Sequence, residues 1–162
     1  MPFVCPISEV IARLDIPAVA SEADLNKLVH STEQTFESPK DSGRSVALAR
    51  LVVDQMSQGP WAFVVLEHGI WPSSELVSLF DRLRKSAGID QGLTEARCEI
   101  VEPGEDDYVT CAIACGLFFC WSFALISLET KSIFYASHDE WFTAWSPDSA
   151  ELEGYFGVFK QF

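Results

Sequence analysis

The chain has 162 residues, and its 24 Asp and Glu against 11 Lys and Arg give a formal net charge of −13. This charge repels phosphate backbones and anionic lipid headgroups, which disfavours nucleic acid and membrane surfaces as direct partners. A hydrophobic content of 48% with 22% charged residues is typical of a globular chain, and the length predicts a single domain, 1–162. The start lacks a basic region followed by an apolar run, so we expect a cytoplasmic protein.

The first third of the chain predicts helices. Apolar residues at helical spacing predict a short helix over residues 7–14. Ser21 begins a pattern similar to a capping box, and a second helix is expected from there to about residue 36. After a polar loop over residues 37–43, a third helical stripe covers residues 48–56.

The middle of the chain mixes strand and helix signals. Residues 61–66 form a short apolar run rich in aromatic and β-branched side chains, which predicts a buried strand. Pro72 with the serine after it is expected to open a helix, and Gly88 is placed to end it in a left-handed conformation. Strand character resumes over residues 97–101, and residues 102–107 form an acidic turn.

Residues 108–128 carry no charged side chain, and a helix of that length could span a bilayer. Gly116 divides the segment, two aspartates precede it, and basic residues that would anchor an orientation are missing on that side. We therefore expect two buried strands, 108–115 and 118–128, rather than a membrane helix.

Two further aromatic strands are expected over residues 132–137 and 141–145, joined by a turn at 138–140. Residues 148–162 are ambiguous, because a possible helix start is followed by two glycines. The predicted fold is α+β, with a helical N-terminal third and helices packed on one face of a mostly antiparallel sheet formed largely by residues 96–145.

The cysteines raise the question of a metal site. An odd number of them, five, suits reduced thiols better than a disulfide framework. Cys111, Cys115 and Cys120 lie close together in the sequence, but they lack the tight Cys-x-x-Cys spacing that structural zinc usually uses. We expect buried structural thiols, no metal and no cofactor.

The histidines His30, His68 and His138 lack the neighbours of a metal or catalytic motif. His138 is followed by Asp139 and Glu140, a grouping that could support acid–base chemistry. A turn or an interface explains the same three residues more simply, since Asp tolerates turn geometry. The sequence contains no phosphate loop, nucleophile elbow or zinc-binding helix motif, and no catalytic residue is assigned.

Acidic residues gather in the C-terminal part, where residues 98–162 carry eleven acids and two bases. One group, residues 99–107, lacks the order of an EF-hand loop and is expected to be a solvated acidic edge. The other, residues 139–153, is interleaved with aromatic residues that could anchor a partner or simply belong to the core. The candidate partner-binding residues are Glu105, Asp106, Asp107, His138, Asp139, Glu140, Trp141 and Trp145.

The run Trp121-Ser-Phe-Ala-Leu-Ile, followed by Ile133-Phe-Tyr-Ala-Ser-His-Asp-Glu-Trp-Phe142, resembles the C-terminal strands of small bacterial immunity proteins of polymorphic or contact-dependent toxin systems. The resemblance covers about residues 119–145. It implies a compact, acidic, cytosolic protein that neutralises a toxin by covering its active site or a nearby surface, and no catalytic residue carries over.

The expected function is therefore non-catalytic binding of a cognate toxin, or another basic protein, through an acidic and aromatic surface. Two other classes stay open: a small hydrolase or transferase using His138, Asp139 or Glu140, and an adaptor or chaperone for a secreted protein. The sequence leaves the oligomeric state open.

Overall fold

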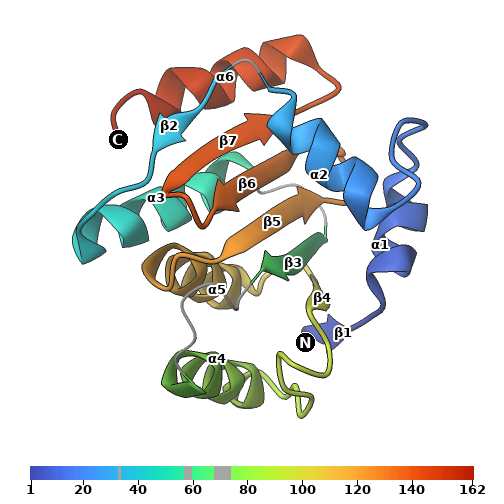
Figure 1. Ribbon diagram of the computed structural model, residues 1–162, viewed down its shortest axis with the longest axis vertical. Coiled ribbons are helices and arrows are strands. Elements are labelled where there is room, and N and C mark those ends of the chain that lie inside the picture. Colours follow the sequence, from blue (N-terminus) through green and yellow to red (C-terminus); the bar gives the residue numbers. More distant parts are fainter. Residues whose placement is uncertain (33, 57–59, 68–73) are drawn as a thin grey trace.

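The computed structural model describes residues 1–32, 34–56, 60–67 and 74–162. Within these residues, seven strands form one antiparallel sheet in the order β1-β4-β3-β5-β6-β7-β2 (Figure 1). The strands are β1 (Phe3–Val4), β2 (Phe36–Glu37), β3 (Trp61–Glu67), β4 (Cys98–Val101), β5 (Ser122–Ser127), β6 (Ile133–Ser137) and β7 (Trp141–Trp145). The helices are α1 (Ile7–Leu14), α2 (Glu22–His30), α3 (Ser42–Gln55), α4 (Ser74–Ser86), α5 (Asp106–Phe118) and α6 (Ser149–Phe159).

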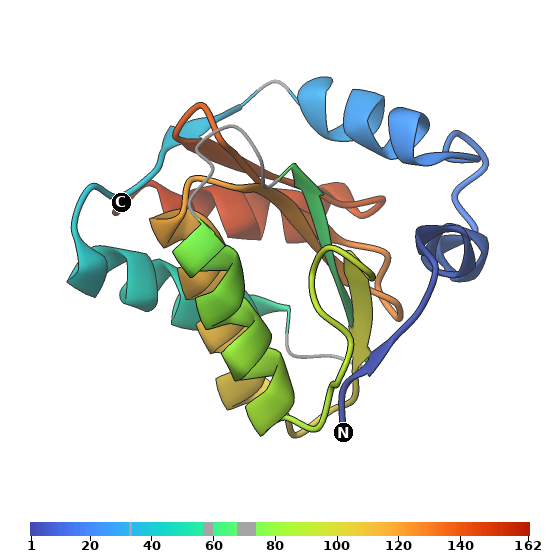
Figure 2. The ribbon, with the colours of Figure 1, turned by 60° about the horizontal axis from the view of Figure 1, so that its bottom comes forward.

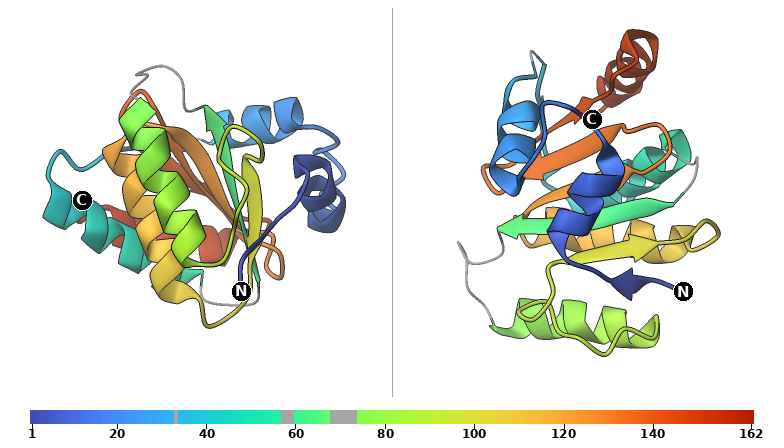
Figure 3. Two further views of the ribbon diagram at one scale, coloured as in Figure 1. Left: turned by 90° about the horizontal axis from the view of Figure 1, so that it is seen from below. Right: turned by 90° about the vertical axis from the view of Figure 1, so that its right-hand side faces the viewer.

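Helices cover both faces of this sheet, as the edge-on view in Figure 3 shows. Successive side chains of a strand point to opposite faces. In β3, Phe63 and Val65 are buried on the face covered by α3, α4, α5 and α6, whereas Ala62 and Val64 are buried on the face covered by α1 and α2. The predicted α+β class and antiparallel sheet are confirmed, with the helices shared between the two faces instead of gathered on one.

Three helix signals in the first half act as the sequence predicts. α1 covers the expected residues, and α2 begins after Ser21, whose Oγ accepts a hydrogen bond from the Asp24 amide at 3.2 Å. Gly88 follows α4 in a left-handed conformation, with φ at 85°, which favours a residue without a Cβ atom. Pro72 and Ser73, expected to open α4, lie outside the described residues.

Two boundaries in this half differ from the prediction. α2 ends at His30 instead of near residue 36, because the hydroxyls of Ser31 and Thr32 donate to carbonyls of its last turn at 2.7 and 2.9 Å. Phe36 then joins the sheet as part of β2, which pairs with β7. α3 begins at Ser42, inside the stretch that was expected to be a loop.

The largest correction concerns residues 108–128. The predicted strand 108–115 is wrong, because these residues belong to α5. The second predicted strand, 118–128, is confirmed only over Ser122–Ser127 as β5, since Phe118 still belongs to α5. Figure 2 shows α4 lying along α5, which is covered from several sides and buries Val109, Ala112 and Ile113 completely. None of the described helices is both long enough and apolar enough to cross a membrane.

The ambiguous C-terminal residues form α6. Asp148 caps this helix, since its Oδ1 accepts hydrogen bonds from the amides of Ala150 and Glu151 at 2.8 and 3.4 Å. Tyr155 and Phe159 are buried against the rest of the core. This packing compensates for the low helix propensity of the two glycines in α6.

A buried ionic cluster joins α4, β4 and α5. The side chains of Arg84 and Glu99 are fully buried, and Arg84 Nε lies 3.0 Å from Glu99 Oε2 as an ion pair. The Tyr108 hydroxyl donates to Glu99 Oε1 at 2.7 Å, and Arg84 Nη1 donates to the Ala96 carbonyl at 2.6 Å. Burial raises the pKa of the Glu99 carboxyl, and the Arg84 guanidinium opposes that rise. The expectation of a solvated edge is therefore wrong for Glu99.

Gly116 lies inside α5 and not at the predicted turn. A Cβ atom at this position would lie 2.5 Å from two ring carbons of Phe123, which is a buried residue of β5. The lack of a side chain at Gly116 therefore lets α5 approach the sheet closely.

Replacing Tyr108 with Phe should destabilise the fold by about 1–3 kcal/mol, because a buried carboxylate oxygen of Glu99 loses its hydrogen-bond donor. Urea unfolding followed by circular dichroism measures this free energy. Cys111→Ser is the matched control, since Cys111 is exposed on the same helix, and it should change stability by no more than about 0.5 kcal/mol. Unfolding midpoints that coincide for Y108F and the wild type would show that the hydroxyl contributes nothing.

Gly116→Ala should destabilise the protein by about 1–3 kcal/mol, because the added methyl group overlaps the ring of Phe123. Gly154→Ala is its control within α6, where an added Cβ meets no atom within 4 Å. This second change should stabilise the protein by up to about 1 kcal/mol, because Ala has the higher helix propensity. The midpoints of thermal and urea unfolding should fall for Gly116→Ala and rise for Gly154→Ala. A midpoint that does not fall for Gly116→Ala would contradict the close approach.

Candidate functional site

The predicted partner-binding residues do not form one surface. Residues 105–107 lie at the N-terminal end of α5, where Glu105 faces the amino group of Met1 at 3.4 Å. Residues 138–140 form the turn between β6 and β7 and lie beside Phe118, at the other end of the same helix. Because a helix rises about 1.5 Å per residue, roughly 20 Å separate the two acidic groups.

The two predicted tryptophans lie on the sheet face that α1 and α2 cover. Trp141 and Trp145 are both half-buried. The ring of Trp141 lies 5.3 Å from the rings of His30 and Tyr135, measured between centroids. Both tryptophans therefore contribute to packing, and their part in partner binding stays a prediction. His68, the third histidine considered from the sequence, lies outside the described residues.

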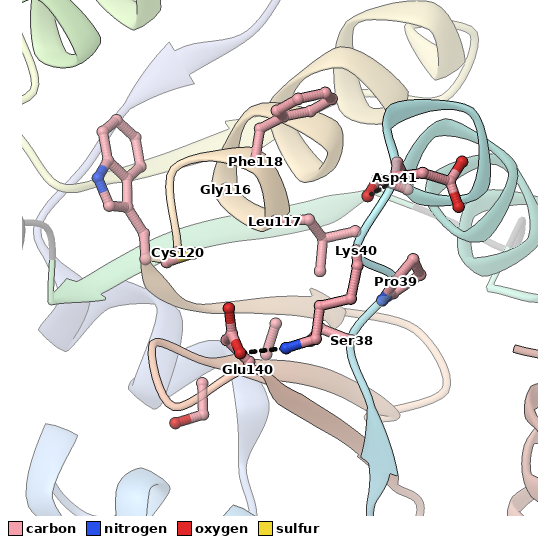
Figure 4. A pocket seen from close by; sticks show the side chains of 13 residues that line it. Ser38, Pro39, Lys40, Asp41, Gly116, Leu117, Phe118, Cys120 and Glu140 are labelled. Carbon is pink, nitrogen blue, oxygen red and sulfur yellow. Dashed lines mark hydrogen bonds and ion pairs between the residues drawn. The ribbon is translucent and has the colours of Figure 1, made fainter.

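A surface depression lies beside the β6–β7 turn, and we call it the hairpin groove. It has a volume of about 560 Å³ and is lined by Leu76, Phe118, Phe119, Cys120, His138, Asp139 and Glu140. A smaller cavity of about 120 Å³ adjoins it and shares Phe118, Cys120 and Glu140 with it (Figure 4). The groove thus combines apolar side chains of α4 and of the C-terminal end of α5 with acidic residues of the turn.

His138 is held by residues from two other strands. Its Nδ1 atom lies 2.8 Å from both Ser122 Oγ in β5 and Glu67 Oε2 at the end of β3. The Ser122 hydroxyl also donates to Glu67 at 3.1 Å and accepts from the backbone amide of His138 at 3.2 Å. Asp139 Oδ1 lies 3.4 Å from the other ring nitrogen. These contacts fix the turn to the middle of the sheet.

The arrangement differs from a nucleophilic site. Ser122 is only 1% exposed, so its hydroxyl is out of reach of a substrate in the groove. A serine nucleophile and its orienting acid use opposite nitrogens of the histidine. Here Ser122 and Glu67 approach the same ring nitrogen of His138, and the carboxylate at the opposite nitrogen, that of the largely exposed Asp139, stays 3.4 Å away. The geometry therefore favours a structural role for this cluster.

Glu140 joins the turn to the chain before α3. Its carboxylate forms an ion pair with Lys40, and Figure 4 shows the two side chains pointing toward each other. The hydrogen bond to Glu140 raises the pKa of the Lys40 amine. The Ser38 amide donates to the Glu140 carbonyl at 2.8 Å. Glu140 takes a left-handed conformation, with φ at 63°, so the turn is tightly constrained.

The thiols of the predicted cluster differ from the expectation of burial. Cys111 is exposed and Cys115 is half-buried, because α5 is a helix with part of its surface turned outward, and Cys120, which follows the end of α5, is also half-buried. Burial raises the pKa of Cys115 to about 11. In the part of the chain that the structure describes, no group of three or more His, Cys, Asp or Glu side chains could hold a metal ion.

Sequence reasoning missed three members of the site, Glu67, Ser122 and Lys40. Glu67 and Ser122 face each other across β3 and β5, and Lys40 is separated from Glu140 by one hundred residues. Only the pairing of distant strands brings them to the turn. A charged residue at the end of the otherwise apolar β3 was the one available signal.

Replacing Ser122 with Ala should destabilise the protein by about 1–3 kcal/mol, because the His138 amide and Glu67 lose a buried partner. The loss should concentrate at the turn, so amide hydrogen exchange should accelerate at His138 and its neighbours. Ser149→Ala, an exposed position at the start of α6, is the control and should leave exchange at the turn unchanged. Unaltered exchange in S122A would mean that Ser122 does not hold the turn.

Comparison of the chain with protein-family models, curated proteins and solved structures gave no significant match. The function must therefore be argued from the geometry of the hairpin groove and the charges around it.

Proposed function

We propose that this protein is a non-catalytic binding protein that contacts a basic protein partner through the hairpin groove. The observation that carries the proposal is Phe118, a large apolar side chain that is 52% exposed beside the carboxylates of Asp139 and Glu140. Exposed apolar side chains with a polar rim mark interaction sites, and aromatic residues often supply much of the binding energy.

The negative charge of this chain indicates that the partner has a basic surface. The chain carries a net charge of −13, and the groove is bordered by acids, so a basic surface would be attracted over a long range. Carboxylates of this kind mainly raise the association rate, whereas desolvated aromatic contacts slow dissociation. A basic protein with an apolar side chain that fits against Phe118 satisfies both requirements.

Within this class, we propose a cytoplasmic immunity protein that binds a cognate bacterial toxin in competition between bacteria. The resemblance over residues 119–145 supports this choice, since that segment contains the turn and part of the groove. An immunity protein need only cover a toxin surface, which agrees with a site that offers charge and apolar area.

A small hydrolase or transferase is the alternative class, and the short contacts of His138 with Ser122 and Glu67 are the observation in its favour. Burial of Ser122 counts against it. An adaptor or chaperone for a secreted protein would use the same surface as an immunity protein. A growth assay distinguishes an immunity protein from an adaptor or chaperone, because only an immunity protein would restore the growth of cells that express a captured toxin.

Asp139→Lys with Glu140→Lys should lower the affinity for the partner and slow association about tenfold or more, because steering charges are reversed. The three baits are the wild type, this double variant, and Asp106→Lys with Asp107→Lys, each immobilised and exposed to lysate from the source cells. Mass spectrometry identifies a basic protein held by the wild type, and surface plasmon resonance with that purified protein then gives rates as salt is raised.

The second double variant is the matched control, because it makes the same change of charge at the far end of α5. It should retain most of the affinity, while association of the wild type should slow with salt as charges are screened. Phe118→Ser should instead speed dissociation. Equal rates for all variants would contradict binding through the groove, and equal losses for both double variants would indicate a general effect of net charge.

A further inference from the structure

Two cysteines far apart in the sequence meet at the edge of the sheet. β1 pairs with β4 in a register that sets Val4 opposite Glu99, and the next residue, Cys5, continues this register. The Cys5 amide donates to the Cys98 carbonyl at 3.2 Å. The two Sγ atoms lie 3.7 Å apart, within hydrogen-bonding reach of each other.

The pair is buried but reachable by a small molecule. Cys5 is 8% exposed and Cys98 is 2% exposed. Both line a depression of about 420 Å³ that opens beside β1 and is bordered by Pro6 and Arg97. A small oxidant could therefore reach the sulfur of Cys5 without unfolding of the sheet.

The two thiols differ in exposure, and their acidity differs in the same sense, which assigns them different roles. The hydrogen bond from the Cys98 thiol lowers the pKa of Cys5, whereas that contact and burial raise the pKa of Cys98. The thiolate is the form that attacks an oxidant. Cys5 is therefore the more reactive and the more exposed of the two, and Cys98 lies in place as the resolving thiol.

We propose that Cys5 and Cys98 are a redox-active thiol pair that forms a reversible disulfide on reaction with a peroxide. The Cys5 thiolate attacks one oxygen of hydrogen peroxide, the O–O bond breaks, and, after proton transfer, Cys5 sulfenic acid and one water are produced. The Cys98 sulfur then attacks the Cys5 sulfur and expels a second water. Both thiols are oxidised by two electrons in total, and the peroxide is reduced.

A disulfide between Cys5 and Cys98 would stabilise the edge of the sheet. β1 has only two residues and lies at the edge of the sheet, so it depends on few contacts. A disulfide to β4 would fasten it and the start of α1 to the sheet. Because directly opposed residues have Cβ atoms slightly farther apart than a relaxed disulfide prefers, the bond should be strained and easily reduced.

The test uses the full chain with Cys111, Cys115 and Cys120 replaced by Ser, so that only the proposed pair carries thiols. Hydrogen peroxide should remove both alkylatable thiols and lower the intact mass by two hydrogen atoms. Peptide mapping without reductant should give a Cys5–Cys98 cross-link, and dithiothreitol should restore both thiols. Hydrogen exchange at the Cys5 amide should slow in the oxidised form.

The control is Cys5→Ser in the same background, which leaves Cys98 alone and should give no loss of two hydrogen atoms. Peptide mapping of the oxidised wild-type chain detects the same cross-link without any substitution, in case the multiple variant folds poorly. Thiols that stay alkylatable, or that take up oxygen without a cross-link, would overturn the proposal and leave the pair with a packing role.

Discussion

The burial of a full ion pair between Arg84 and Glu99 is the constraint on which the arrangement of α4, β4 and α5 depends. Taking two charges out of water has a large desolvation penalty, which is offset only while both partners and their hydrogen bonds stay in place. Tyr108 and the Ala96 carbonyl supply those bonds. Loss of α4 or β4 leaves a buried charge unpaired, and loss of α5 leaves a buried Glu99 oxygen without its donor, so the three elements must be positioned together. That requirement fixes the N-terminal end of α5 and, one helix length away, the position of Phe118.

The parts of the fold that were predictable are those with a local signal. The spacing of apolar residues gave α1, the Ser21 cap gave the start of α2, and short aromatic runs gave β3, β6 and β7. α5 has no such signal, because it is apolar around most of its circumference, including the outward side with Cys111 and Phe118, and shows no stripe. The sequence pattern predicts an acidic turn at Asp106 and Asp107, but both residues lie in the first turn of α5, where acids favour a helix through its dipole.

In the candidate site, too, the residues that could be predicted are those with a local signal. The turn at residues 138–140 was predictable because its three residues are consecutive and lie between two recognisable strands. Glu67, Ser122 and Lys40 were not, since each comes from another element and only the strand order brings it close. The same holds for Cys5 and Cys98, which are 93 residues apart in sequence. A single sequence states which residues can form a strand, but it does not state which strands become neighbours.

The contacts around the turn also bear on how well the groove could bind. Association costs entropy for every side chain or loop that must be ordered, and a preformed surface lowers that cost. Ser122 and Glu67 hold His138 from within the sheet, and Lys40 holds Glu140 from outside it. Many of the other C-terminal acids have structural partners, as Glu151 does with the hydroxyls of Ser132 and Ser146. The acids free to meet a partner are therefore fewer than the net charge implies. At the turn, Glu140 is already paired with Lys40, so Asp139, whose side chain is 70% exposed, is the more available acid on this ordered support next to Phe118.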